Sequence, residues 1–328
     1  MKCMKVPLEE AEVVKRRLIN ESLLDFNYKL LKEDGYIYYP VVHGILGYPT
    51  VEKTLEKKTP KNLKDALKKI LTKNEILNLN TAFDTIGNIA VLEIVRSLEK
   101  KKKIIANELL KVNKNIKTVV MKKGGHEGEY RIQKYEYLFG EKNFETLHRE
   151  NGVLLKLDIT KTYFTPRWSS ERLRIAKFVK PNEEVLVMFS GVGIFGLVIA
   201  KHTKAKEIVC VEINPDACEY AEENIKINKI KNMKNYCGDV KKVMLKFEDK
   251  KFDRIVMPLP KDSLKFLKLA FNYLKKYGII HLYAFSTEDD IHKKIKKIES
   301  DYNCKIFNVI KTGQQSPRMW RYCLDIKT

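Results

Sequence analysis

A glycine-rich segment in the second half of the chain has the residue types of a nucleotide-binding loop. Gly191, Gly193 and Gly196 have the spacing G-x-G-x-x-G, and Glu212 follows about 20 residues later. The glycines allow a tight turn and a close approach of a ligand to a helix N-terminus, and the acid can accept hydrogen bonds from both ribose hydroxyls. Nicotinamide cofactors and S-adenosylmethionine use similar geometry, and a tight turn without a ligand is a third interpretation.

Two further motifs favour S-adenosylmethionine. Asp239 follows the third expected strand, where a carboxylate would hold the amino group of adenine. The fourth expected strand ends in Met257-Pro258-Leu259-Pro260, where methyltransferases that act on base nitrogens carry a short motif containing proline. Two features of the chain's organisation also favour S-adenosylmethionine. The glycine loop follows, along the chain, segments that could bind RNA, and the sheet is expected to end in an antiparallel hairpin. Asp239 could also cap a loop, and the prolines could simply end the strand.

The elements that must position these residues alternate between strand and helix from about residue 167. Such alternation predicts right-handed βαβ crossovers and a parallel sheet with helices on both faces. The expected strands are 184–189, 207–212, 235–238, 252–257 and 278–285, and the expected helices are 198–202, 215–228, 263–276 and 289–300. The last two strands, 304–311 and 318–326, have no helix between them and should pair antiparallel.

Two smaller units are expected before this sheet. Residues 1–45 have the pattern of a strand, a helix and a hairpin around Asp34-Gly35, a dipeptide that favours tight turns. Residues 46–60 contain Gly, Pro and charges without apolar periodicity and are interpreted as a linker. Residues 61–165 are expected to form a second α+β domain, and residues 166–328 the cofactor-binding domain.

The chain is strongly basic, with 63 Lys and Arg against 42 Asp and Glu and a formal net charge of +21. The first 60 residues contribute +1, residues 61–165 contribute +8, and residues 166–328 contribute +12. A basic surface of this size favours a polyanionic partner, with nucleic acid first and an anionic membrane surface second. A lysine-rich proteome would give the same balance.

The composition excludes several classes of protein. Hydrophobic residues make up 44% of the chain, which is enough for packed cores and excludes a disordered protein. No stretch approaches the ~18 uninterrupted apolar residues of a membrane span, and the first residues lack the apolar core of a signal peptide. The six cysteines form no C-x-x-C pair and no cluster with histidine, so we expect no metal site, no disulfides and a cytoplasmic location.

Six motifs follow one another along the chain: Glu129-Tyr130-Arg131-Ile132, Leu147-His148-Arg149-Glu150-Asn151-Gly152, Tyr163-Phe164-Thr165-Pro166-Arg167, Ser170-Glu171-Arg172, Met188-Phe189-Ser190-Gly191-Val192-Gly193 and Ser316-Pro317-Arg318. Together they resemble the archaeal and eukaryotic tRNA guanine-37 N1-methyltransferases and the related wyosine-pathway enzymes, over nearly the whole chain. The resemblance implies a Rossmann-like class I methyltransferase sheet, mostly parallel with a C-terminal antiparallel hairpin, preceded by two small α+β domains. It also implies S-adenosylmethionine as cofactor and tRNA as partner, held at the anticodon arm and, by the N-terminal domain, at the outer corner. We expect a monomer without a membrane partner.

The resemblance gives roles to individual catalytic residues. It implies that Arg131 stabilises negative charge on guanine O6, that Glu171 removes the N1 proton, and that Pro258 and Pro260 lie beside the transferred methyl. The chemistry is reasonable by itself, because guanine N1 becomes nucleophilic only as its proton leaves, which requires a base and a cation at O6. Glu171 could instead be an ordinary acid in the first turn of a helix, and Arg131 a surface arginine.

The same resemblance implies two sets of binding residues. The expected cofactor-binding residues are Tyr163, Phe189, Ser190, Gly191, Val192, Gly193, Glu212, Ile213, Asn214 and Asp239. The candidates for contact with tRNA phosphates are Arg149, Arg167, Arg172, Arg174 and Arg318. Tyr163 could also be a core aromatic residue, and each arginine a solvated charge. His148 is expected to be structural.

Two positions depart from the usual motifs of this family. Val187 stands where an Asp commonly precedes Met-Phe, and Pro258 stands where an Asn holds the edge of guanine. Loss of the Asn removes a polar contact, and a less polar pocket would admit a tricyclic base. Pro258 therefore makes a second activity a hypothesis, the methylation of C7 in 4-demethylwyosine, as in some dual-function archaeal members.

Three other functions stay open. A related enzyme transfers the aminocarboxypropyl group of S-adenosylmethionine to the tricyclic base, but the retention of both Arg131 and Glu171 argues against it. A non-catalytic RNA-binding protein with a degenerate cofactor fold would explain Val187 and Pro258. A nicotinamide oxidoreductase would leave the basic N-terminal half unexplained.

Overall fold

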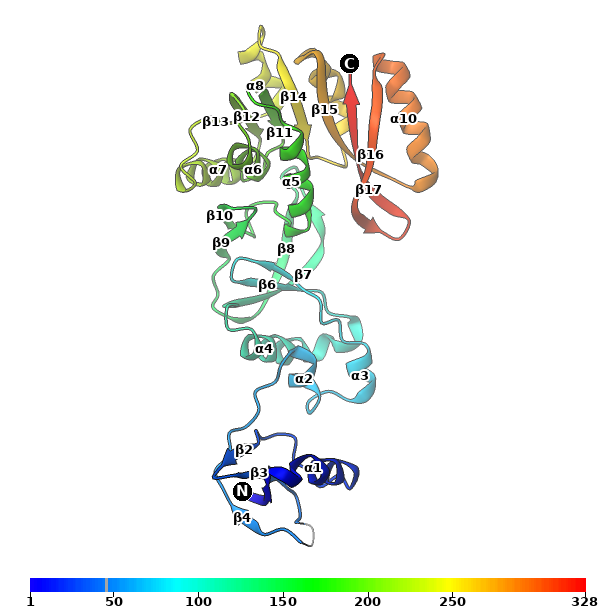
Figure 1. Cartoon of the computed structure of the whole chain (residues 1–328). Helices are drawn as coiled ribbons and strands as arrows, with labels where there is room; N and C mark the ends of the chain where they lie inside the picture. Colours follow the sequence, from blue (N-terminus) through cyan, green and yellow to red (C-terminus); the bar gives the residue numbers. More distant parts are fainter. Residues whose placement is uncertain (45–46) are drawn as a thin grey trace. The chain divides into compact units, whose positions relative to one another are not determined.

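The computed structural model describes residues 1–44 and 47–328, which form two compact units, residues 1–76 and 77–328 (Figure 1). The first unit is a four-stranded sheet ordered β2-β3-β1-β4. Its strands are β1 (Lys2–Pro7), β2 (Leu31–Glu33), β3 (Tyr36–Pro40) and β4 (Thr50–Glu52). Helix α1 (Ala11–Asn20), after a 3₁₀ turn at Leu8–Glu10, packs Val14 and Leu18 against the sheet. The predicted turn at Asp34-Gly35 joins β2 to β3, and both residues have positive φ.

Strand β4 lies in the segment that was expected to be a linker. Its residues pair with β1, and Tyr28 forms a further bridge with Lys57. A short edge strand is held mainly by backbone hydrogen bonds, so it needs no apolar periodicity that the sequence would display. Ile45 and Leu46, at the same predicted boundary, lie outside the described residues. Helices α2 (Leu63–Leu67) and α3 (Lys73–Leu77) follow.

The second unit begins with a four-stranded sheet ordered β5-β6-β7-β8. Strands β6 and β7 are parallel, and the other two pairs are antiparallel. The elements are β5 (Asp84–Ile86), β6 (Ile89–Leu92), a 3₁₀ turn (Arg96–Lys101), α4 (Lys102–Val112), β7 (Thr118–Glu127) and β8 (Ile132–Gly140). A separate hairpin of β9 (Glu145–Glu150) and β10 (Val153–Asp158) turns at Asn151-Gly152.

A seven-stranded sheet ordered β13-β12-β11-β14-β15-β17-β16 carries the glycine loop. The first five strands in this order are parallel, and β17 is antiparallel to both of its neighbours, β15 and β16, which confirms the predicted sheet with its C-terminal hairpin. The strands are β11 (Glu184–Met188), β12 (Glu207–Glu212), β13 (Met233–Cys237), β14 (Phe252–Met257), β15 (Leu274–Ser286), β16 (Lys305–Ser316) and β17 (Met319–Lys327). The helices are α5 (Ser169–Phe178), α6 (Ile194–His202), α7 (Pro215–Ile227), α8 (Val240–Met244), α9 (Leu267–Asn272) and α10 (Glu288–Tyr302), with 3₁₀ turns at Pro166–Trp168, Leu245–Phe247 and Ser263–Phe266.

Helices cover both faces of this sheet, as predicted. Val185 and Val187 of β11 belong to the core with α5, α6 and α7, whereas Leu186 and Met188 belong to the core with α8, α9 and α10. Strands β6, β7 and β10 also contribute to the first core, so the predicted boundary at residue 165 does not separate two cores. Because Val187 is fully buried among apolar side chains, an Asp in its place would have to find a partner for a buried charge.

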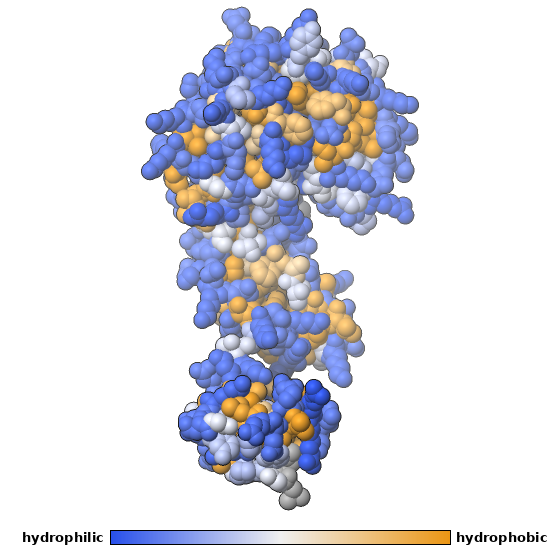
Figure 2. All heavy atoms as spheres, in the orientation of Figure 1, coloured by the Kyte–Doolittle hydropathy of each residue, from blue (hydrophilic) through white to orange (hydrophobic). Residues whose placement is uncertain are grey.

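Hydrophilic side chains cover most of the face drawn in Figure 2, and hydrophobic residues show only in separate patches. This cover agrees with the high content of lysine and arginine in the chain. Within the described ranges, none of the helices combines the length and the apolar content that crossing a bilayer would require.

Candidate active site

A cavity of about 640 Å³ opens at the carboxyl ends of the parallel strands. The loops after β11 and β14 supply Gly191 and Pro258 to its wall, the end of β12 supplies Glu212, and the β7–β8 turn supplies Arg131. Ligands of open α/β sheets bind outside the carboxyl ends of the strands, where the strand order reverses, and here it reverses between β11 and β14. The cavity therefore brings the predicted cofactor loop and the predicted catalytic arginine together.

The glycine loop has a backbone that residues with side chains rarely adopt. The φ angle is 56° at Gly191 and 85° at Gly193, which is the N-cap of α6. A Cβ atom at Gly196 would lie 2.6 Å from Cys210 Sγ and 2.9 Å from Met233 Sδ. The first two glycines therefore shape the turn, and the third lets α6 pack closely on β12 and β13.

Glu212 ends β12 and reaches back to the glycine loop. Its Oε2 accepts a hydrogen bond from the backbone N–H of Gly191 at 2.7 Å, and its Oε1 accepts one from that of Asn214 at 2.9 Å. Burial raises the pKa of the Glu212 carboxyl, while these backbone hydrogen bonds oppose the rise. Each carboxylate oxygen can accept a second hydrogen bond, so the group fits the two ribose hydroxyls of a nucleoside cofactor.

The predicted cofactor-binding residues fall into two groups, those that line the cavity and those that only build the glycine loop. Those that line the cavity are Tyr163, Phe189, Gly191, Glu212, Ile213, Asn214 and Asp239. Those that build the loop without being part of the lining are Ser190, Val192 and Gly193. Asp239 also accepts a hydrogen bond from the backbone N–H of Lys241 at 2.9 Å, so it caps α8 and faces the cavity at the same time.

Arg131 stands in the turn between β7 and β8 with a left-handed backbone, φ 55°. Its Nη2 donates a hydrogen bond to Oδ2 of Asp262 at 2.9 Å, and both side chains line the cavity. Asp262 follows Pro258 and Pro260, which also line the cavity, in the loop after β14. Sequence reasoning missed Asp262, because a single acid in a loop belongs to no periodic pattern.

Several other cavity residues carried no sequence signal. The ring of Phe266 packs against that of Phe189 at 4.9 Å between centroids, and the guanidinium of Arg321 lies 4.1 Å from the ring centroid of Trp168. Burial lowers the pKa of Arg321 to about 10. Further members of the lining are His126, Phe285 and Gln315. These residues come from distant strands and turns, so only the folded chain brings them together.

Glu171 lies in the first turn of α5 and is 6% exposed. Arg174 donates hydrogen bonds to both of its carboxylate oxygens at 2.8 Å, and the hydroxyl of Tyr283 donates one to Oε1 at 2.6 Å. The lining of the cavity includes Trp168 and Arg131 but not Glu171. The predicted cation therefore lines the cavity, and the predicted base does not.

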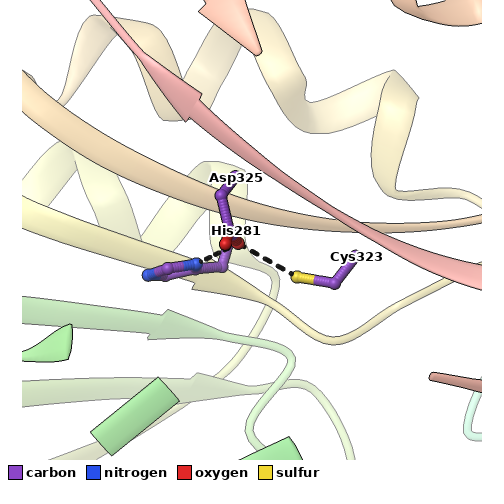
Figure 3. Close-up of side chains that lie close together, drawn as sticks. All are labelled: His281, Cys323 and Asp325. Carbon is purple, nitrogen blue, oxygen red and sulfur yellow. Dashed lines mark hydrogen bonds and ion pairs between the residues drawn. The ribbon is translucent and has the colours of Figure 1, made fainter. Parts of the chain in front are cut away.

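Arg174 also donates a hydrogen bond to Asp325, which forms a second buried group of polar side chains with His281 and Cys323 (the three are drawn in Figure 3). His281 Nδ1 lies 2.6 Å from Asp325 Oδ1, and Cys323 Sγ lies 3.4 Å from the same oxygen. Arg254 lies 2.7 Å from His281 Nε2 and can only donate, so the imidazole proton is on Nδ1 and is shared with Asp325. Burial lowers the pKa of His281, which agrees with a neutral ring. His, Cys and Asp can bind metals. Here the guanidinium of Arg174 contacts Asp325 and that of Arg254 contacts His281, and these two positive charges disfavour a metal cation, so the cluster is a hydrogen-bonded network.

Comparison with known proteins places this site in a family. The family model described as the TRM5/TYW2 methyltransferase domain matches residues 146–309, and models described as the TYW2 N-terminal domain and the tRNA methyltransferase 5 N-terminal domain match residues 63–143 and 3–48. A curated relative, the tRNA (guanine(37)-N(1))-methyltransferase Trm5b of Pyrococcus abyssi, is 37% identical over 99% of this chain and 98% of its own. The chain belongs to the Trm5/TYW2 family.

Solved structures of this family are similar to the whole chain. The crystal structure of Trm5b from Pyrococcus abyssi has a TM-score of 0.73 at 36% identity, and the complex of aTrm5 with tRNALeu has a TM-score of 0.80 at 31% identity. Each similarity covers 100% of this chain and 99% of the other. Another relative, the tRNA (guanine(37)-N(1))/4-demethylwyosine(37)-methyltransferase Taw22 of Nanoarchaeum equitans, is 34% identical over 66% of this chain and 88% of its own.

Two of the five arginines that the resemblance assigned to tRNA contact form ion pairs with carboxylates of the protein itself. Arg172 is 2% exposed, and its guanidinium donates to Glu150 and to the backbone carbonyl of Thr165, each at 2.7 Å. Arg174 is held by Glu171 and Asp325. Burial of Arg172 disfavours its contact with a phosphate, and the carboxylate partners of Arg174 occupy donors that such a contact would need. The arginines that are exposed are Arg149, Arg167 and Arg318.

His148 of the family motif is structural, as expected. Its Nδ1 accepts a hydrogen bond from the backbone N–H of Gly87 at 3.1 Å, which ties β9 to the turn between β5 and β6. Burial and the nearby Arg172 lower the pKa of His148 to about 4, so the ring is neutral at pH 7 and can serve as this acceptor.

Proposed function

We propose that this protein transfers a methyl group from S-adenosylmethionine to N1 of guanosine 37 in tRNA. The observation that carries the proposal is the shared cavity of Arg131 and Glu212. The cation that N1 chemistry requires and the carboxylate that fits a nucleoside cofactor face the same space. Relatives from Pyrococcus abyssi and Methanocaldococcus jannaschii are named for this activity.

The cofactor part of the proposal rests on the loops after β11, β12 and β13. S-adenosylmethionine, when bound, supplies an electrophilic methyl group on its sulfonium. Glu212 would accept hydrogen bonds from the ribose hydroxyls, and Asp239 one from the amino group of adenine. Tyr163, which lines the same cavity, would cover the cofactor and exclude water. A solved structure of a relative, Methanocaldococcus jannaschii TYW2 in complex with AdoMet, supports this choice of cofactor.

The base chemistry needs a cation and a proton acceptor. As the N1 proton leaves, negative charge spreads to O6, where Arg131 would donate hydrogen bonds. Glu171 is the proposed acceptor of the proton, on the strength of the family motif Ser170-Glu171-Arg172. Because its carboxylate does not line the cavity, contact with the base would require neighbouring side chains to move or a water molecule to bridge.

The proposed partner is tRNA. The exposed Arg149, Arg167 and Arg318 lie in the two segments that carry nearly all of the excess positive charge. The second unit would hold the anticodon arm, and the first unit the outer corner of the tRNA. All six cysteines are free thiols, in keeping with a cytoplasmic protein, and we include a monomeric state in the proposal.

The direct test is methyl transfer to unmodified tRNA transcripts that carry guanosine or adenosine at position 37. We expect one methyl group on N1 of guanosine 37 and none on adenosine 37, measured by mass spectrometry of nuclease digests. A product with the mass of an aminocarboxypropyl group would instead support the related transferase. Absence of S-adenosylmethionine binding by calorimetry would support a non-catalytic RNA-binding protein.

A second activity, C7 methylation of 4-demethylwyosine, is favoured by Pro258, which lines the cavity and has no polar side-chain group. The name of the relative Taw22 includes this substrate. We expect Pro258→Asn to shift the ratio of activities toward guanosine 37 by about tenfold, because the new amide would bind the guanine edge. Rates on both tRNA substrates would measure the ratio, with Pro181→Asn at an exposed position as control. An unchanged ratio would contradict the role of Pro258.

A further inference from the structure

We propose that Asp262 is a specificity-determining residue that accepts a hydrogen bond from the 2-amino group of the target guanine. The proposal rests on the proposed function and deepens it. It starts from the pair on the cavity wall, in which Asp262 Oδ2 accepts from Arg131 Nη2 at 2.9 Å. The two side chains are 33% and 22% exposed, so a ligand in the cavity can reach both.

The order of hydrogen-bonding groups on this pair matches guanine. Along its Watson–Crick edge guanine presents the O6 acceptor, then the N1–H donor, then the 2-amino donors. Arg131 offers donors and the adjacent Asp262 offers acceptors, so one arrangement satisfies O6 and the 2-amino group together. Adenine presents an amino donor at position 6, which would meet the donors of Arg131, and only a C–H at position 2, which would leave the acceptor of Asp262 without a partner. The pair therefore distinguishes guanine from adenine by the hydrogen-bonding groups at positions 6 and 2 of the base.

Asp262 keeps acceptor sites free for this purpose. A carboxylate has about four lone-pair sites. One of these takes Arg131 at Oδ2, and one takes Lys265, whose Nζ lies 2.8 Å from Oδ1. Hydrogen bonding to Lys265 and the nearby Arg131 lower the pKa of Asp262, so the group is an anionic acceptor at neutral pH.

Pro258 leaves the cavity wall near Arg131 without the side-chain amide that would bind the guanine edge. It lies on the same wall, four positions before Asp262, where the resemblance expects an Asn on the guanine edge. Proline has neither a side-chain amide nor a backbone N–H. Asp262 is the carboxylate that the fold holds beside Arg131, and it supplies the contact that Pro258 lacks.

Inosine is the probe, because it keeps O6 and N1–H and lacks only the 2-amino group. We expect the wild-type protein to methylate tRNA with guanosine 37 about 10- to 100-fold more efficiently, in kcat/KM, than tRNA with inosine 37. In Asp262→Ala the two efficiencies should come within about threefold of each other. In Asp262→Asn, which retains an acceptor oxygen but not the charge, part of the preference should remain.

The alternative is that Asp262 only orients Arg131. In that case Asp262→Ala would lower both rates by the same factor, and the unchanged ratio would overturn the proposal, as would a wild-type protein without preference for guanosine. Asp249→Asn, at an exposed position, is the matched control, and S-adenosylmethionine affinity verifies that each variant is folded. Failure of the proposed function is distinct, because the wild-type protein would then methylate neither tRNA.

Discussion

Replacement of Glu171 by Gln is expected to slow methyl transfer to guanosine 37 by about 100- to 10,000-fold, the usual contribution of a general base. The amide keeps the size of the side chain but cannot take the N1 proton. Affinity for S-adenosylmethionine should stay within about threefold, because Glu171 does not line the cavity and its hydrogen-bond partners Arg174 and Tyr283 lie outside the cofactor loops. Single-turnover rates and calorimetric titration measure the two effects separately.

The surroundings of Glu171 make this variant informative. Arg174 and Tyr283 hold the carboxylate with three hydrogen bonds, and it does not line the cavity. A decrease of less than tenfold in a folded Glu171→Gln protein would contradict its role as base. It would also direct attention to Asp262, the carboxylate that faces the cavity beside Arg131. Glu219→Gln on the exposed side of α7 is the control.

Replacement of Glu150 by Ala is expected to lower the free energy of unfolding by about 3–5 kcal/mol, because it leaves the guanidinium of Arg172 buried without its partner. Both side chains are 3% exposed. Arg149→Ala, one residue away and exposed, should change stability by no more than about 0.5 kcal/mol.

Denaturant unfolding followed by tryptophan fluorescence measures this effect. The only two tryptophans, Trp168 and Trp320, both lie in residues 77–328, so the signal reports on the unit that contains the ion pair. A loss of less than about 1 kcal/mol in Glu150→Ala would mean that Arg172 finds another partner or water. Combining Glu150→Leu with Arg172→Met should restore most of the stability, because an apolar pair replaces both charges.

Local patterns were sufficient for most of the cofactor half. Alternating strand and helix patterns predicted the parallel sheet, since the apolar residues of each element mark the faces that it buries. The glycine spacing and Glu212 predicted the loop, because a tight turn and a strand-end acid are neighbours along the chain. The helix expected over 263–276 was too long, since β15 already begins at Leu274 and pairs there with Phe252.

Burial of charged residues could not be predicted in this way. Arg149 and Arg172 are both arginines in family motifs, yet one is exposed and the other is enclosed with Glu150. Charged residues are almost never fully buried unless they are paired, so exposure was the reasonable expectation. The partner that buries this charge, Glu150 at the end of β9, is 22 positions away from Arg172 in α5, and only the folded chain brings the two side chains together.

The sequence by itself determined the family, the parallel sheet and the glycine loop and predicted a cation at Arg131, because each motif that carries them consists of residues close together along the chain. Only the tertiary structure decided which acid meets that cation. Asp262 is 131 positions from Arg131. Arg131 lies in the turn between β7 and β8, and Asp262 lies in the loop after β14, so the two side chains meet only in the folded chain. Local sequence specifies elements and their buried faces, whereas contacts between loops depend on how those elements are assembled. For that reason the fold was largely predictable, and the pairing of Arg131 with Asp262 was not.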